Sequence, residues 1–415
     1  MSFSFSFSGN DIEEDDHDAT PNDPSESITT SLKNTTINPT SQPPTTIAPK
    51  RHTLSDLLQS LPDQLSYNYI DVPLSPHNTH EDTRSNTDED ALSNTDTGPI
   101  SLRIPRRSLF DIRQQLMHES DPVDESSEVT RTSSLLSGLE TGDLSTGIYE
   151  GGFKTWECAV DLASFVSWKV DSGSSFLSSG AFTFEEEEEG MQGGGWRVVE
   201  LGAGSAVPCL VLLRRVLEER RRMGGASRGT VRFTLCDYNE DVLRLCTAVN
   251  VFLTVVLTVG LEDGLSEEEE EDDLEVDEDL VGECLETLQD ANIEVDFVSG
   301  AWGNEFLELL KEPGERAGES DMEKIGEEVL VLASETIYEP RSLDVFSKTV
   351  VDILSLSLDK GKAEAYVAAK KVYFGVGGGV AEFEEEIRKV GGKTKTVLDV
   401  KGAGVGRVVL EVMAG

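Results

Sequence analysis

A short stretch near the middle of the chain, VVELGAGSA (198–206), combines a carboxylate with closely spaced glycines. Glu200 stands at the end of an apolar run, and Gly202 and Gly204 follow in a turn that leads into a predicted helix. Glycines in such a turn let the backbone approach a ligand closely. A dinucleotide-binding turn would carry a third glycine where this chain has Val207. Because a carboxylate is also a poor neighbour for pyrophosphate, the turn favours a cationic ligand.

S-adenosylmethionine is such a ligand, because it carries both an ammonium and a sulfonium. The next apolar run ends in CDYN, which places Asp237 at the end of the second predicted strand. A carboxylate there suits the two ribose hydroxyls of a nucleoside; the alternative is a carboxylate that caps the following helix or lies on the surface. The third run ends in SGAWG (299–303), where Trp302 is expected either to stack beside an adenine or to pack in the core.

The elements that must position these residues alternate between strands and helices from residue 147 onward. Strands are expected at 196–204, 231–239, 293–302, 329–338 and 363–374, with helices at 156–168, directly after 206, and at 240–252, 341–358 and 380–390. Two more strands, at 393–401 and 407–414, flank GAGVG and predict a hairpin. This alternation predicts an α/β fold with a doubly wound, mostly parallel sheet and a C-terminal antiparallel hairpin.

The chain before residue 146 has a different composition. Residues 1–52 are rich in Ser, Thr, Pro and Asn and are predicted to be a disordered tail. Residues 53–145 are predicted to be a partly ordered extension with short helices, because leucines recur at helical spacing in 53–74 and again in 104–119. These helices are expected to dock on the main domain at 146–415; the alternative is transient helices in a tail.

Three acidic or glycine-rich runs, near 185–195, 262–286 and 311–328, are predicted to be solvated insertions between elements. The alternative is an acidic fringe that steers a basic substrate. The chain of 415 residues has a formal net charge of -44, which argues against direct nucleic-acid binding and is compatible with a basic protein partner. Its five cysteines include no CxxC pair, so we expect reduced thiols in an intracellular protein and no metal site. No apolar run is long enough to predict a membrane span.

Together these stretches resemble a seven-strand, Rossmann-like S-adenosylmethionine-dependent methyltransferase, and more narrowly the histidine protein methyltransferase family. The resemblance is carried by TGIYEGGFKTWECAVDL (146–162), VVELGAGSAVPCL (198–210), CDYNEDVL (236–243), SGAWG, LASETIYEP (332–340) and AKKVYFGVGGGV (369–380), and it extends to RRSLFDIRQQLM (106–117) and LPDQLSY (61–67). The combination of KTWEC, SETIY and YFGVGGG is the specific part. The family's known target is a histidine of a large-subunit ribosomal protein.

The resemblance therefore implies a protein-histidine methyltransferase that uses S-adenosylmethionine, has a basic ribosomal protein as substrate, and works as a monomer in the cytoplasm and nucleus. Carried over by position, cofactor contacts beyond Glu200 and Gly204 fall on Thr155, Trp156, Glu157, Cys158, Ala159, Gly202, Asp237, Tyr238, Asn239, Ala301, Trp302 and Ser334. The chain departs from the pattern in two places. Ser205-Ala206 stands where many methyltransferases keep a third glycine, and Ala301 stands where an acidic residue is expected.

The expected reaction is attack of a neutral imidazole nitrogen on the sulfonium methyl group. Histidine is largely neutral near pH 7, so positioning matters more than a strong base. A carboxylate that accepts the other ring N–H would select the nucleophilic nitrogen. Glu335 is the candidate because it follows the fourth strand at the sheet edge where ligands collect, and Tyr338 is expected to line the same pocket. The alternative for Glu335 is a structural or helix-capping role.

The glycine-rich loop before the last helix is expected to form a wall of the substrate pocket, with its missing side chains leaving room for a substrate loop. Its substrate-binding residues are predicted to be Tyr373, Gly375, Gly377, Gly378 and Gly379. Three other functions are compatible with the sequence: a lysine methyltransferase of the same fold, a methyltransferase-like binding module without catalysis, and a nicotinamide dehydrogenase. Lysine must lose a proton before it attacks, so a lysine enzyme would gain activity steeply with pH.

Overall fold

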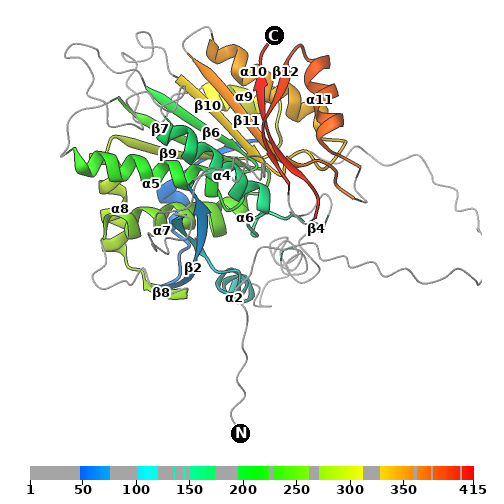
Figure 1. Ribbon diagram of the computed structural model, residues 1–415. Helices are drawn as coiled ribbons and strands as arrows, with labels where there is room; N and C mark the ends of the chain where they lie inside the picture. Colours follow the sequence, from blue (N-terminus) through cyan, green and yellow to red (C-terminus); the bar gives the residue numbers. More distant parts are fainter. Residues whose placement is uncertain are drawn as a thin grey trace, which may run out of the picture.

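The computed structural model describes residues 47–74, 101–119, 135, 144–145, 149–172, 195–223, 229–260, 271–311, 328–358, 362–374, 377–401 and 404–415. A sheet of eight strands runs through the centre of this part of the chain, in the order β1-β9-β7-β6-β10-β11-β13-β12 (Figure 1). Its strands are β1 (Lys50–Thr53), β6 (Trp196–Leu201), β7 (Val231–Asp237), β9 (Ile293–Ser299), β10 (Glu328–Ser334), β11 (Ala363–Lys370), β12 (Lys393–Val400) and β13 (Arg407–Met413).

The central strands β9, β7, β6, β10 and β11 are mutually parallel, and β13 joins β11 and β12 in antiparallel pairs. The predicted mostly parallel sheet with an antiparallel C-terminal hairpin is therefore confirmed. After β6 the chain adds β7 and β9 on one side and then returns to add β10 on the other. In sheets of this kind, ligands bind in the crevice at such a reversal, which here corresponds to the carboxyl ends of β6 and β10.

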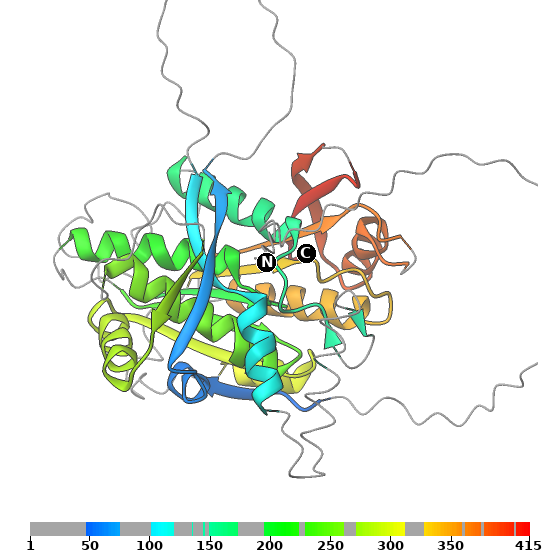
Figure 2. The same cartoon turned by 90° about the horizontal axis from the view of Figure 1, so that it is seen from below.

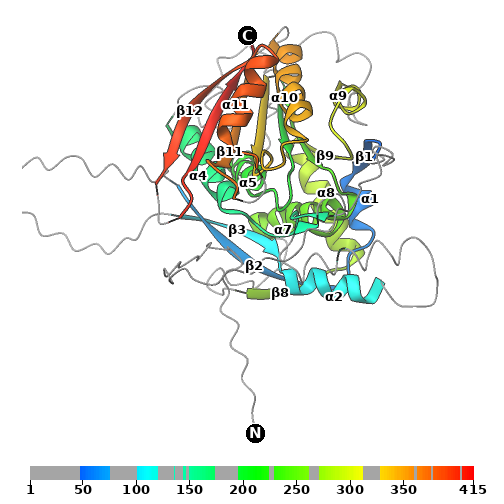
Figure 3. The same cartoon turned by 90° about the vertical axis from the view of Figure 1, so that its right-hand side faces the viewer.

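Helices cover both faces of the sheet (Figure 3). The cluster on one face includes side chains of α4 (Glu157–Asp171), α5 (Val207–Arg222), α7 (Ala248–Val259) and α8 (Glu278–Asp290), and the other face carries α9 (Asn304–Lys311), α10 (Leu343–Leu358) and α11 (Val380–Lys389). Alternation along β6 divides its side chains between the two cores, because Val198 belongs to the first and Val199 to the second. The strands are thus buried on both faces, as expected for parallel strands.

A continuous helical run follows β7. It consists of α6 (Glu240–Val242), a π-helical segment η2 (Leu243–Thr247) and α7, and it is longer than the helix expected at 240–252. Its length of 20 residues and mean hydropathy of 2.1 would suit a membrane span, but 78% of its most apolar window is buried inside the fold. The run is accordingly a core helix of this domain.

The N-terminal extension is built differently from the prediction. Only Leu54–Leu58 (α1) is helical in the first leucine-rich segment, and Gln64–Pro73 forms strand β2. In the second segment β3 (Ser101–Arg107) precedes α2 (Leu109–Glu119), whose Ile112 and Leu116 are buried as the helical spacing indicates. β2 and β3 pair side by side, as the blue and cyan strands of Figure 2 show.

Two predicted boundaries need correction. The tail was expected to end at residue 52, but β1 pairs antiparallel with β9 from Lys50 to Thr53 and so belongs to the main sheet. The insertion expected at 262–286 contains β8 (Glu271–Glu275), which pairs with β2, and most of α8. Two short strands, β4 (Leu144–Ser145) and β5 (Tyr149–Glu150), pair with each other. The other two insertions lie almost wholly outside the described residues.

Candidate functional site

The glycine turn after β6 has the left-handed backbone that its glycines permit. Gly202 has φ +67° and Gly204 has φ +50°. A Cβ atom on Gly202 would lie 2.6 Å from Cγ2 of Thr336, so the turn is pressed against the SETIY segment that follows β10. Ala206 also has a positive φ, 58°, although a side chain there costs roughly 1–2 kcal/mol. Ala206, which stands where a third glycine was expected, therefore keeps the left-handed conformation that glycine favours.

Asp237 at the end of β7 faces this turn. Its Oδ2 accepts from the backbone N–H of Gly204 at 3.1 Å, and its Oδ1 accepts from the N–H of Asn239 at 3.1 Å. Asn239, in turn, caps α6 by accepting from the N–H of Asp241, so the capping role considered for Asp237 belongs to Asn239. Tyr238 is 40% exposed beside them. The structure thus brings the carboxylate and the glycine turn together, as the sequence predicts.

Glu200 lies behind the turn and is fully buried. Its Oε2 accepts from the N–H of Cys209 in the first turn of α5 at 3.1 Å, and its Oε1 has no hydrogen-bond partner among the described residues. Burial raises the pKa of this carboxyl to about 8. In this structure Glu200 therefore joins strand to helix, and its predicted contact with the ammonium of the cofactor stays a prediction.

The loop after β9 is covered by the N-terminal segment that enters β1. The N–H of Ala301 donates to the carbonyl of Ile47 at 3.0 Å, and a Cβ atom on Gly300 would lie 2.7 Å from the carbonyl oxygen of Ala48. Trp302 is partly buried and packs on Phe346 of α10, with ring centroids 4.9 Å apart. Trp302 thus has the core contact that was one of its two expected roles, and the adenine contact stays a prediction.

The KTWEC segment lies over the same turn. Thr155 Oγ1 donates to Ser205 Oγ at 2.8 Å, and a Cβ atom on Gly204 would lie 3.1 Å from the carbonyl oxygen of Gly152. The indole N–H of Trp156 donates to the carbonyl of Gly151, and α4 begins at the next residue. Cys158 and Ala159 are buried there, and Glu157 pairs with Lys370 and Arg407. Thr155 of this segment therefore lies beside the turn, whereas the ion pairs of Glu157 are with residues of β11 and β13.

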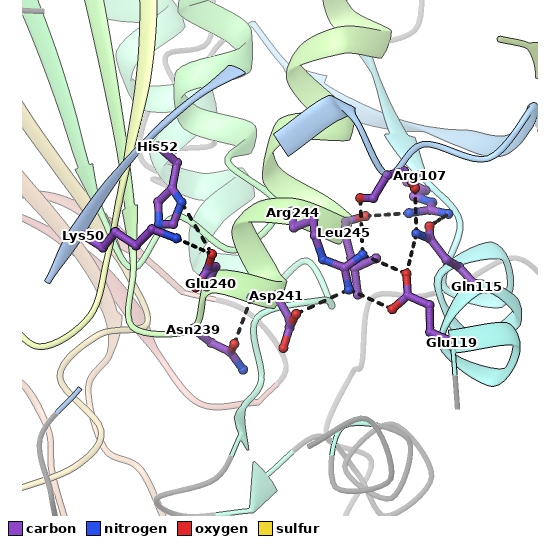
Figure 4. A network of polar contacts seen from close by, with 11 residues as sticks. Lys50, His52, Arg107, Gln115, Glu119, Asn239, Glu240, Asp241, Arg244 and Leu245 are labelled. Carbon is purple, nitrogen blue, oxygen red and sulfur yellow. Dashed lines mark hydrogen bonds and ion pairs between the residues drawn. The ribbon is translucent and has the colours of Figure 1, made fainter. Parts of the chain in front are cut away.

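A polar network that sequence reasoning did not foresee ties the N-terminal extension to the helical run after Asp237 (Figure 4). Lys50 of β1 pairs with Glu240 at 3.1 Å, and Arg244 makes two hydrogen bonds to Glu119 at the end of α2. The guanidinium of Arg107 donates to the carbonyl of Leu245 inside η2 at 3.1 Å. The extension is thus fastened to the π-helical segment, a local geometry that is frequent at functional sites.

One side chain carries this connection to the glycine turn itself. Asn250 of α7 accepts from the backbone N–H of Arg107 at 2.7 Å and donates to the carbonyl of Ser205 at 3.0 Å. Thr247 adds a hydrogen bond to the carbonyl of Gly204 at 2.7 Å. The signal in the sequence is a lone amide within the apolar run VNVFLTVV, because a buried amide needs partners.

Glu335 and two tyrosines form a compact group at the carboxyl end of β10. Glu335 has φ +55°, and its N–H donates to the carbonyl of Ala368 at 3.0 Å. The hydroxyl of Tyr373 donates to Glu335 Oε2, whereas Oε1 is buried with no partner among the described residues. Burial raises the pKa of Glu335, and the neighbouring Cys158 thiol and Tyr373 hydroxyl oppose that rise. Tyr338 contacts Tyr373 edge to face, with centroids 6.2 Å apart.

In the glycine-rich loop, Gly378 is required by close packing against the backbone, whereas the sequence led us to expect open space for a substrate. A Cβ atom on Gly378 would lie 2.2 Å from the carbonyl oxygen of Tyr338, so the loop and the SETIY segment touch backbone to backbone. Gly377 has φ +96°, and Gly379 stands directly before α11. Gly375 lies outside the described residues. The substrate-binding role of the loop stays a prediction.

The residues of this crevice fit S-adenosylmethionine. Asp237 is a partly exposed carboxylate at the turn, suited to ribose hydroxyls. Thr336, whose Oγ1 has no hydrogen-bond partner among the described residues, adjoins the same turn. A carboxylate beside a turn of glycines lets a nucleoside approach the backbone closely and bind through its ribose hydroxyls. The strand order and this site define a Rossmann-like, S-adenosylmethionine-dependent methyltransferase.

Comparison with known proteins gives the family. Histidine protein methyltransferase 1 of Saccharomyces cerevisiae is 32% identical over 405 residues, which cover 92% of this chain and 90% of the yeast protein. The protein of the same name from Schizosaccharomyces pombe is 31% identical over 69% of each chain. The chain therefore belongs to the histidine protein methyltransferase 1 family, and it is an S-adenosylmethionine-dependent enzyme that acts on protein histidine.

Two other comparisons add nothing to this assignment. No protein-family model matches the chain. A magnesium protoporphyrin IX methyltransferase from Synechocystis PCC 6803 shares 10% identity over 62% of this chain and 83% of its own, with a TM-score of 0.29. At that score the superposition carries no argument, and the fold rests on the strand order described above.

Proposed function

We propose that this enzyme methylates a histidine of a basic large-subunit ribosomal protein. The resemblance to the histidine protein methyltransferase family supports the ribosomal target, and the net charge of -44 supports a basic partner. The proposal includes action as a monomer in the cytoplasm and nucleus, without direct contact with nucleic acid. The single observation on which the chemistry depends is the group of Glu335, Tyr338 and Tyr373 beside the glycine turn.

When bound, S-adenosylmethionine supplies an electrophilic methyl group to the imidazole nitrogen. Asp237 and the turn at Gly202 and Gly204 hold the nucleoside part, with Asp237 accepting from ribose hydroxyls. Glu335 accepts the N–H of the other imidazole nitrogen through Oε1, its buried oxygen with no partner among the described residues. This hydrogen bond fixes the tautomer of the acceptor, so that the second nitrogen presents its lone pair.

Glu335 also stabilises the charge that the acceptor gains. As the nitrogen–methyl bond forms, the sulfonium–methyl bond breaks and its electron pair stays on the sulfur, which becomes a neutral thioether. The ring becomes an imidazolium, and its remaining N–H proton is held against the carboxylate and then lost to it or to water. A hydrogen bond to a charged group is stronger in a buried site than in water. Histidine suits this arrangement better than lysine, because a neutral imidazole is available near pH 7 without a strong base.

The test is incubation of the purified enzyme with labelled S-adenosylmethionine and purified large ribosomal subunits or their free proteins. Mass spectrometry of digested proteins then locates the labelled residue. We expect one basic ribosomal protein to carry a single methyl group on a histidine. Absence of label from every large-subunit protein would reject the ribosomal target, and label on lysine would reject the proposed chemistry.

A further inference from the structure

The hydroxyl of Tyr373 is held from two sides. Its oxygen accepts from the backbone N–H of Lys370 at 3.2 Å, and its proton is donated to Oε2 of Glu335. Because a hydroxyl has one proton, the bond from Lys370 directs that proton toward the carboxylate. Oε2 is thereby occupied, and Oε1 is the oxygen of this carboxyl that has no partner among the described residues.

We propose that Tyr373 is a positioning residue for the reaction, which locks the Glu335 carboxylate so that Oε1 receives the N–H of the target imidazole. The proposal rests on the proposed function, since it assigns Glu335 to the acceptor histidine. The sequence predicts that Tyr373 contacts the substrate directly. In this proposal it contacts Glu335 instead, and Glu335 contacts the substrate. In this role it acts through Glu335 and selects which oxygen is open.

The backbone around Glu335 supports a built site. A non-glycine residue at φ +55° costs free energy and persists only where the surroundings impose it. Three contacts impose it. The N–H of Glu335 donates to the carbonyl of Ala368, and its carboxyl accepts from Tyr373. The backbone at Tyr338, three residues later, is packed against Gly378. A carboxylate that only filled space would not require this conformation.

Charged and titratable groups reach Glu335 from two elements. Cys158 and Glu157 belong to α4, and Lys370 and Tyr373 lie at and after the end of β11. Burial raises the pKa of Glu335, and the charge of Glu157 adds to that rise, whereas the neighbouring Cys158 thiol, the hydroxyl of Tyr373 and the charge of Lys370 oppose it. Removal of the Tyr373 hydroxyl must therefore raise that pKa, so that ionised Glu335 is recovered only at higher pH.

The chain offers a matched control. Tyr366 in the middle of β11 also donates its hydroxyl to a carboxylate, Glu364 Oε2 at 2.6 Å, and it is fully buried. Its carboxylate lies earlier on the same strand and pairs with Lys169. Tyr366→Phe removes the same kind of bond within β11, seven residues before Tyr373, without touching Glu335.

The experiment compares Tyr373→Phe, Glu335→Gln and Tyr366→Phe in the full-length enzyme. The readouts are kcat with saturating protein substrate, the Kd for S-adenosylmethionine by calorimetry, and Tm. For Tyr373→Phe we expect kcat to fall about tenfold or more near pH 7.5, in line with loss of a hydrogen bond to a charged group, with the cofactor Kd unchanged. Part of that loss should be recovered near pH 9 in Tyr373→Phe and not in Glu335→Gln, which has no carboxylate to ionise. Tyr366→Phe should keep the wild-type kcat.

Wild-type kcat in Tyr373→Phe would overturn the proposal, and so would a parallel fall in kcat, cofactor affinity and Tm, which would indicate a structural role. The proposed function fails separately, if the wild-type enzyme labels a residue other than histidine. The variants therefore test the role of Tyr373, whereas the wild-type enzyme tests the proposed function.

Discussion

At the scale of single residues, Glu200 combines a predicted ligand role with a structural one. Its carboxyl is fully buried, bonded to the N–H of Cys209, and has a pKa raised to about 8. A folded-state pKa above the unfolded one means that the folded protein favours the protonated form. The contribution to stability is therefore complete below about pH 4.5 and is lost as pH rises toward 8.

Glu200→Gln should consequently raise the free energy of unfolding at pH 8 and leave it nearly unchanged near pH 5, because glutamine keeps an acceptor for Cys209 and cannot ionise. Urea unfolding at several pH values measures this difference. Glu218→Gln, on the exposed side of α5, is the matched control and should show no such pH dependence. If Glu200→Gln destabilises the protein most at pH 8, the ionised carboxylate is needed in the fold and this account of Glu200 is wrong.

The residues of the site were partly predictable from the sequence. Asp237 and the glycine turn follow from strand ends and glycine spacing, so their meeting at one sheet edge was expected. The bond between Tyr373 and Glu335 was not, because it joins residues 38 positions apart through a loop whose path no periodic pattern describes. The role of Gly378 could not be predicted from the sequence either, because close contact between two backbones and open space for a substrate both require glycine.

At the scale of elements, the N-terminal extension is part of the methyltransferase fold. β1 adds a strand to the main sheet, and the network of Figure 4 fastens α2 and β3 to the helical run after Asp237. Asn250 continues this connection to the carbonyl of Ser205 in the glycine turn. The extension therefore supports the glycine turn of the cofactor site through Asn250.

Asn250→Ala tests this connection. It leaves the N–H of Arg107 and the carbonyl of Ser205 without their side-chain partner, and each buried unpaired group costs about 1–3 kcal/mol. We expect a loss of about 2–6 kcal/mol of stability in denaturant unfolding and weaker binding of S-adenosylmethionine in calorimetry.

Thr254 of the same helix provides the control, because its buried hydroxyl has no hydrogen-bond partner among the described residues. Thr254→Val should be neutral or stabilising and should leave cofactor affinity unchanged. Equal cofactor affinity in Asn250→Ala and the wild type would show that the extension stabilises the fold without supporting the turn.

The elements missed by sequence reasoning share a physical cause. β8, with the sequence EDDLE, carries residues that disfavour strands, and it forms because β2 offers an edge to pair with. β2 was not predicted, because the leucines at helical spacing just before it favoured a helix over the whole segment. β1 adjoins a stretch without apolar periodicity and is defined by its pairing with β9. In each case a partner far along the chain overrides the local preference.

At the scale of the whole molecule, the strong negative charge should act on the rate of encounter with a basic substrate. Exposed charges attract over roughly 8–10 Å at ordinary ionic strength and less at higher salt. We expect the KM for a basic protein substrate to rise severalfold between low and moderate salt, with kcat and the KM for S-adenosylmethionine changing little. Steady-state kinetics over a salt series measures this effect. A KM for the protein substrate that does not change with salt would contradict a steering role for the negative charge of the chain.

The fold class was predictable at this scale because strands and helices alternate in the sequence, and the crevice at β6 and β10 follows from the strand order. The chemistry placed there, methyl transfer to a histidine, is the central claim. Its most direct test is acid hydrolysis of the protein substrate after reaction with labelled S-adenosylmethionine, followed by separation of the amino acids. We expect the label to elute as methylhistidine and to be strongly reduced when Glu335→Gln replaces the wild type. Label that elutes as methyllysine would contradict it.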